Sequence, residues 1–339
     1  MWKNRTINYS LKNNFSHITA VILPSTKPLL LQKTIAMVSE HLQTFLNKPV
    51  QDFLPPTTID PEKFVYRLRV DYEDEGVTIS DLLEAFVRDP QVGKVTELII
   101  GQFNAEVSES SFEVVDKLVS LKDSLPALKA LFIGDITYEE CEISWINQTD
   151  ITPILKAFPA LEHLQIRGGE GLSFSELQHD ELKTLIIETG GMPPEVVAQV
   201  NAARLPNLQK LELWLGSDEY GFASTTADLA TVFSGSTFPK LTQLGLMDSV
   251  IQDDIAIAIA QAPVLNQLQV LDLSKGVLTD TGAAALLNSA GIKKLKHLNL
   301  RHHFMSEAMM EQLRSLGTSI NVDDKQEDDD DYRYVEVAE

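Results

Sequence analysis

One pattern, Leu-x-x-Leu-x-Leu with other aliphatic residues allowed, recurs eight times between residues 95 and 300 and constrains the fold of this chain more than any other feature. Successive copies begin 21 to 33 residues apart. A period of this length indicates an architecture in which each copy is one structural unit stacked on the next. The aliphatic positions are filled, copy by copy, by Val95/Leu98/Ile100, Leu128/Leu131/Ile133, Leu161/Leu164/Ile166, Leu182/Leu185/Ile187, Leu208/Leu211/Leu213, Leu241/Leu244/Leu246, Leu268/Leu271/Leu273 and Leu295/Leu298/Leu300.

The spacing inside the pattern predicts a strand. Side chains alternate between the two faces of a strand, so the last two aliphatic residues of each copy point to one side and the residue between them to the other. Segments with helical periodicity separate the copies, at 112–121, 194–203, 226–234, 253–262, 280–289 and 306–316. A strand and one helix cannot hide their apolar faces alone, so each unit must stack on its neighbours. The sequence therefore predicts an α/β solenoid, a horseshoe of about eight repeats with a parallel concave sheet and convex helices.

These repeats resemble the leucine-rich-repeat superfamily in its helix-bearing, ribonuclease-inhibitor-like form. Other segments resemble a group of uncharacterised bacterial leucine-rich-repeat proteins with no established activity, namely YRLRVDYEDEG (66–76), GDITYEECEISWI (134–146), ETGG (188–191), WLGSDEYG (214–221) and YRYV (332–335). The resemblance implies the solenoid fold and a bacterial cytoplasmic setting, and it implies no chemistry.

Composition divides the chain into four regions. Residues 1–36 hold five basic residues and no acid, which sets them apart as a leader that is disordered or an artefact of the start codon, with a transit peptide as the alternative. Residues 37–94 are expected to cap the array, and residues 95–322 to form the solenoid. The acidic run DDKQEDDDD opens a tail at 323–339. Such a run repels itself and cannot bury a core, although the alternating segment 332–337 can still dock as a short strand.

Charge and composition exclude several functions. The chain carries 28 basic and 49 acidic residues, a net charge of −21, which is the wrong sign for binding nucleic acid or an anionic membrane surface. The longest apolar run, 255–260, is far too short to cross a bilayer. The single cysteine permits no intramolecular disulfide, and no phosphate-loop, zinc-protease or nucleophile-elbow motif occurs. We therefore expect a cytoplasmic protein with no cofactor, no metal and no catalytic residues.

The sequence DYEDEG at 71–76 mimics the first half of a calcium-binding loop, in which alternate carboxylates surround the ion and a glycine makes the turn. The twelfth position of such a loop is Leu82, however, where a bidentate glutamate is required. Ser80 and Asp81 are better explained as caps of a helix over 82–87. Calcium binding is therefore the less favoured interpretation.

Two further groups invite a chemical interpretation. His297, His302 and His303 are close in sequence, but His297 and His303 are expected to project outward, with no acidic residue at ligand spacing. Metal binding is therefore not expected there. Cys141 lies among glutamates, which raise the pKa of a thiol and do not activate it, so we expect an inert cysteine.

The outward face of the sheet and the long inserts are the remaining candidates for function. Arg167, Glu188 and Trp214 occupy one outward column on three successive strands, so we expect them about 5 Å apart from strand to strand, in one continuous patch. Aromatic residues and arginine amid polar residues are typical of protein-binding hot spots. The alternative is that the inserts fold back and bury this face. The candidate binding residues are Phe132, Glu139, Glu140, Trp145, Arg167, Glu188, Glu212, Trp214, Tyr220, Asp272 and Arg301.

Two functions remain open. The favoured one is a non-enzymatic scaffold that binds another protein, of unknown identity, through the concave face or the inserts. The alternative is an enzyme or enzyme subunit with a site under the inserts near 135–150 and 167–191, for which Glu139, Glu140, Arg167 and Glu188 are the candidate residues. The sequence shows no nucleophile paired with a base, so binding is the expected function.

Overall fold

The computed structural model describes residues 38–71, 76–104, 109–328 and 333–338. The chain divides into two units, Met1–Thr34 and Ile35–Glu339, and the described residues all belong to the second. The leader 1–36, the centre of the calcium-like sequence and residues 329–332 of the acidic tail lie outside the described residues.

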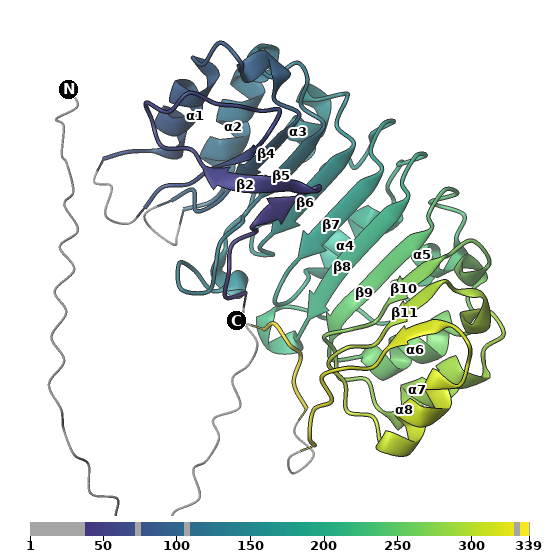
Figure 1. Ribbon diagram of the computed structural model, residues 1–339. Coiled ribbons are helices and arrows are strands. Elements are labelled where there is room, and N and C mark those ends of the chain that lie inside the picture. Colours follow the sequence, from purple (N-terminus) through teal and green to yellow (C-terminus); the bar gives the residue numbers. More distant parts are fainter. Residues whose placement is uncertain (1–37, 72–75, 105–108, 329–332, 339) are drawn as a thin grey trace, which may run out of the picture. The chain divides into compact units, whose positions relative to one another are not determined.

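One sheet of twelve strands organises this unit (Figure 1). The strands follow one another in the sheet in the order of the sequence, and all neighbours from β2 to β12 pair in parallel. Among the twelve strands of the described residues, β1 and β2 form the one antiparallel pair. The strands are β1 (Thr44–Phe45), β2 (Lys48–Asp52), β3 (Val65–Leu68), β4 (Glu97–Ile100), β5 (Ala130–Ile133), β6 (His163–Arg167), β7 (Thr184–Glu188), β8 (Lys210–Gly216), β9 (Gln243–Ser249), β10 (Val270–Asp272), β11 (His297–Asn299) and β12 (Ser319–Asn321).

The eight copies of the leucine pattern form strands β4 to β11, as predicted. The pattern stays in register across the sheet, with Leu98 opposite Leu131 and Leu211 opposite Leu244. Aliphatic residues of the pattern, which we call the frame residues, are buried; Leu213, for example, has no exposed surface. The parallel α/β solenoid is therefore confirmed. The sheet also continues beyond the recognisable copies, through β2 and β3 before them and β12 after them.

Helices connect the strands and pack against the face into which the frame leucines point. In Figure 1, for example, α4 lies behind β7 and β8. Within the described ranges, none has the length and apolar content of a membrane-spanning helix. The helices are α1 (Ile79–Val87), α2 (Phe112–Ser120), α3 (Thr152–Ala157), α4 (Pro194–Asn201), α5 (Ala230–Ser234), α6 (Gln252–Ile259), α7 (Asp280–Asn288) and α8 (Glu307–Arg314).

Helix α1 is present and begins earlier than predicted; Asp81 takes part in its cap as expected, but Ser80 does not. The N-cap is Thr78, whose hydroxyl accepts a hydrogen bond from the N–H of Asp81 at 3.1 Å. The Asp81 carboxylate accepts one in return from the N–H of Thr78, also at 3.1 Å. This reciprocal pair is a capping box, so the helix begins before Ser80 and not after it.

The β1–β2 hairpin covers part of the face opposite the helices, which we call the outward face. Phe45 of β1 packs against Ile99, Ala130 and Phe132, whose side chains point to this face. In Figure 1 the purple hairpin crosses in front of β4 and β5. The outward face of the first repeats is therefore not open to solvent.

Candidate functional site

Arg167 and Glu188 lie opposite each other on β6 and β7 and form a buried ion pair. The Arg167 Nε donates to a Glu188 carboxylate oxygen at 2.6 Å, and the Gln165 amide donates to the other oxygen at 2.7 Å. Arg167 also donates to the carbonyl of Ile136 at 2.9 Å. Each charged side chain is only 5% exposed. The expected closeness of the two residues is confirmed, but their polar groups are satisfied within the protein.

Phe132 lies beside this pair and has no exposed surface. The Phe45 ring stacks at 6.4 Å between centroids, and the Arg167 guanidinium lies 5.3 Å from the centroid of the Phe132 ring. Phe132 therefore packs within the fold and is not available to a partner in this conformation.

Trp214 on β8 is 8% exposed. Its indole N–H donates to Glu212 at 3.1 Å, and the Lys275 ammonium lies 4.7 Å from the ring centroid, which is a cation–π contact. Glu212 also pairs with Lys210 at 2.8 Å. Trp214 and Glu212 thus have partners within the protein, and the continuous exposed patch expected around Trp214 is not present.

The C-terminal segment 333–338 packs against the repeats near Lys275, although it does not form a strand. Glu336 forms ion pairs with Lys275 at 2.8 Å and with Arg301 at 2.6 Å, and its N–H donates to the Lys275 carbonyl. Burial alone would raise the pKa of Glu336, but Lys275 and Arg301 outweigh burial and hold that pKa below its usual value. Val335 and Val337 are each 2% exposed. The hairpin therefore covers the outward face of the first repeats, and the tail packs at the carboxyl ends of β9 to β11. The insert after β5 also contributes, as the alternative interpretation expects, because its Ile136 carbonyl bonds Arg167.

Asp248, at the end of β9, receives the end of the tail. Its carboxylate accepts a hydrogen bond from the N–H of Val337 at 2.8 Å. The side chain is completely buried, and burial raises the pKa of the carboxyl well above its usual range against the opposing effect of the Val337 bond. Its second oxygen has no hydrogen-bond partner among the described residues. Burial therefore favours the neutral form of the Asp248 carboxyl over the charged form.

The other two candidates on the repeats are also engaged. Asp272 accepts hydrogen bonds from the Asn299 amide at 2.8 Å and from the N–H of Ser274 at 3.0 Å. Arg301 pairs with Asp324 at 2.8 Å as well as with Glu336. Both side chains therefore stabilise the last repeats and the tail.

The predicted outward orientation of His303 is wrong, because its side chain is fully buried and hydrogen-bonded to the Val322 carbonyl at 3.0 Å. His302 is also buried, and the tail brings Asp324 and Glu336 close enough for one ligand atom of each to lie within 4.8 Å of the others. Sequence spacing could not reveal this group, since its acids come from the tail. Arg301 already pairs with both carboxylates, so the positive charge that a metal would supply is present.

Glu139 and Glu140 lie in the insert that follows β5. Glu139 is exposed. Glu140 accepts hydrogen bonds from His41 at 3.2 Å, from Arg69 at 3.2 Å and from the N–H of Thr137 at 2.8 Å. Burial would raise the pKa of Glu140, but the bonds from His41 and Thr137 outweigh it and lower that pKa. Glu140 therefore ties the N-terminal segment to the insert as a carboxylate.

The two remaining candidates, Trp145 and Tyr220, line a groove at the carboxyl ends of β5 to β8. The groove consists of two adjoining depressions of about 500 and 860 Å³. Its lining comes from the segments 144–147, 169–173, 190–193 and 219–221 and from Pro194, Glu195 and Gln199 of α4, and we call it the insert groove. Trp145 is 60% exposed there, against 8% for Trp214. Among the aromatic candidates, Trp145 is therefore the one most accessible to a partner.

Glycines allow the loops of the insert groove to pack backbone against backbone. A Cβ on Gly191 would lie 2.1 Å from the Tyr220 carbonyl oxygen, and one on Gly216 would lie 1.8 Å from that of Gly190. Gly191 and Gly216 are joined by an antiparallel bridge. These contacts fix the loops after β7 and β8 against each other, so the floor of the groove is preformed.

A crystal structure of a Bacteroides fragilis protein from the Northeast Structural Genomics Consortium is 35% identical, covers 80% of this chain and 76% of its own, and superposes with a TM-score of 0.73. The chain belongs to the same family as that protein. Its leucine pattern and its sheet of strands in sequence order give it a leucine-rich-repeat fold. An internalin from Listeria monocytogenes is similar at 13% identity and a TM-score of 0.25, over 76% of this chain and 79% of that chain. No protein-family model and no curated protein sequence matches.

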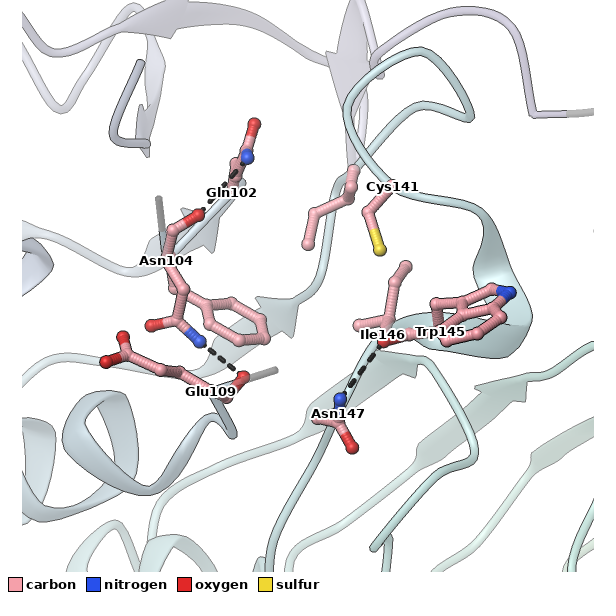
Figure 2. A pocket seen from close by; sticks show the side chains of 9 residues that line it. Gln102, Asn104, Glu109, Cys141, Trp145, Ile146 and Asn147 are labelled. Atoms are coloured by element: carbon pink, nitrogen blue, oxygen red, sulfur yellow. Dashed lines mark hydrogen bonds between the residues drawn. The ribbon is translucent and has the colours of Figure 1, made fainter. Parts of the chain in front are cut away.

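A second, smaller pocket of this leucine-rich-repeat protein contains its cysteine. In Figure 2, Cys141 and Ile146 of the insert lie across this pocket from Gln102 and Asn104. The pocket has a volume of about 20 Å³, enough for about one water molecule. Burial, followed by the nearby charges of Glu142 and Glu140, raises the pKa of the Cys141 thiol to about 11. Such a thiol stays protonated at neutral pH, in agreement with the predicted inert cysteine.

Proposed function

We propose that this leucine-rich-repeat protein is a non-enzymatic scaffold that binds another protein through the insert groove. The exposure of Trp145 carries the proposal. A large aromatic side chain at the edge of a preformed groove is a typical anchor for a protein partner, because it offers much contact area at little cost in conformational entropy.

The four residues considered for catalysis also favour a binding function over an enzymatic one. Arg167 and Glu188 neutralise each other in a buried pair. Glu140 accepts several hydrogen bonds and has a lowered pKa, which is unfavourable for a general acid near neutral pH. Of the four residues considered for catalysis, only Glu139 is exposed.

The proposal is tested by co-purification from the organism that makes the protein, using tagged wild type, Trp145→Ala and Phe112→Ala in parallel. Phe112, on α2, is a matched control because it is also aromatic and is 64% exposed. We expect wild type and Phe112→Ala to retain the same partner in constant proportion. Trp145→Ala should lose at least about 2 kcal/mol of affinity, roughly thirtyfold, at an unchanged melting temperature. Full retention of the partner by Trp145→Ala would contradict the proposal.

A further inference from the structure

The insert groove has an unbalanced charge. Glu170, Glu195 and Glu219 are exposed in its lining, and the lining contains no lysine or arginine. None of these three carboxylates has an ion-pair partner among the described residues. Glu162, by contrast, pairs with Lys129 at 3.0 Å and also with Lys183. The groove therefore presents negative charge for which this part of the chain supplies no counter-charge.

The aromatic residues stand beside these acids. Trp145, Tyr220, Glu170 and Glu219 all line the larger depression. A cation placed on the indole face would gain a cation–π contact and would lie near two carboxylates at once. The same chain already uses this combination internally, where Lys275 lies 4.7 Å from the Trp214 ring centroid and pairs with Glu336.

The shape of the groove favours an extended segment over a rounded ligand. Its two depressions share Ser144, Glu170, Tyr220 and Gly221, so they form one continuous channel across the ends of several strands. The smaller one is walled by the glycine-containing loops, where few side chains obstruct a backbone. The close packing of Gly191 on Tyr220 holds the channel in shape, which lowers the entropy cost of binding.

We propose that the partner enters the insert groove as an extended segment carrying arginine. The guanidinium stacks on Trp145 and pairs with Glu170 and Glu219, because a planar guanidinium stacks on an aromatic face and binds a carboxylate through paired N–H groups. The net charge of −21 steers such a segment toward the protein. This inference rests on the proposed function and adds to it the chemistry of the partner.

The test is fluorescence anisotropy with a labelled glycine-serine peptide containing two arginines, and with the same peptide carrying glutamine in their place. The full chain is compared with the double variant Glu170→Gln/Glu219→Gln. A second double variant, Glu113→Gln/Glu311→Gln, changes the net charge equally at exposed positions on α2 and α8.

We expect the arginine peptide to bind the wild type and the control with equal Kd, the groove variant to raise Kd about tenfold, and the glutamine peptide to bind much more weakly. Equal weakening by both double variants would show general attraction to an acidic protein and would overturn the proposal, as would no binding to the wild type. If Trp145→Ala loses the native partner while Glu170→Gln/Glu219→Gln keeps it, the groove binds protein but not through a cation. Retention by both variants would contradict the proposed function itself.

Discussion

The guanidinium of Arg167 lies 2.6 Å from the carboxylate of Glu188 on the neighbouring strand, and neither side chain has more than 5% of its surface exposed. Removing two charges from water is costly, and their attraction offsets that cost only when the remaining polar atoms are also satisfied. Gln165 and the Ile136 carbonyl provide those bonds. The pair therefore stabilises the fold, whereas the sequence predicts that these two residues belong to a binding patch.

A double-mutant cycle measures this pair. Either single substitution, Arg167→Met or Glu188→Gln, should lower the free energy of unfolding by about 3 to 5 kcal/mol, and the double variant should lose less than the sum. Arg167→Met should be the worse of the two. It leaves Glu188 with only the Gln165 amide, whereas Arg167 in Glu188→Gln keeps Asp135 at 3.8 Å. Chemical denaturation gives these values, and additive losses would show that the pair is not coupled.

Trp214→Ala should reduce stability. The side chain is 8% exposed and is held by Glu212 and Lys275, so truncation leaves a cavity and costs about 3 to 5 kcal/mol. Trp145→Ala is the control, because a 60% exposed tryptophan should change stability by no more than about 0.5 kcal/mol. The measurement is the melting temperature of each variant. Similar melting temperatures for the two variants would indicate that Trp214 lies on an open surface.

Deletion of residues 333–339 should lower the melting temperature. It removes the buried Val335 and Val337 and leaves Lys275 without the carboxylate of Glu336. Burial of two valines corresponds to about 3 to 6 kcal/mol before the entropy of ordering the segment is subtracted, so a net loss of about 2 kcal/mol is expected. An unchanged melting temperature would show that the tail does not contribute to the fold.

Asp248 should make the protein less stable as the pH rises. Its pKa is raised in the folded state, so its contribution is fully present below the unfolded value of 3.8 and is lost as the pH rises through the folded value. Asp248→Asn keeps an acceptor for the Val337 N–H and cannot ionise. We expect this variant to melt like the wild type near pH 4 and above it at pH 8. A lower melting temperature at pH 8 would mean that the carboxylate is ionised and required.

His163 should have the opposite dependence on pH. It is 8% exposed, and burial lowers its pKa to about 4 from 6.5, so stability is lost as the pH falls from about 6.5 toward 4. The full effect corresponds to roughly 3 kcal/mol. His163→Gln should therefore gain stability relative to the wild type across this interval. Parallel pH profiles of melting for the two proteins would contradict this assignment.

The leucine pattern predicts β4 to β11 and their register because every copy repeats one strand geometry. The additional strands are harder to find. In β3 the frame positions opposite Leu98 and Ile100 are taken by Tyr66 and Leu68, and β12 presents only Ile320 opposite Leu298. The end units depart from the pattern because their surroundings differ from those of a central repeat. The strand β12 has a neighbour on one side only, and β3 lies beside β2, which belongs to the hairpin.

The candidate site is less predictable because its cover comes from distant segments. Register alone places Arg167 beside Glu188, but the Val337 contact with Asp248 spans 89 residues and leaves no periodic signal. Trp145 and Tyr220 were identified because they are aromatic residues in inserts, and the structure shows both lining one groove. The glutamates Glu170 and Glu219 were missed, since their relation to Trp145 appears only when the loops after β5, β6 and β8 are brought together.

The sheet ends at each side in a very short strand, β1 of two residues and β12 of three. A sheet edge with unpaired N–H and C=O groups can recruit a strand from another molecule, and short edges flanked by charge suppress that pairing. At the β12 edge, Asp323, Asp324, Glu327 and Asp328 follow directly in the chain. The acidic tail therefore has a second consequence besides its docking: like charges on two approaching copies repel, which opposes strand pairing between copies at the β12 edge.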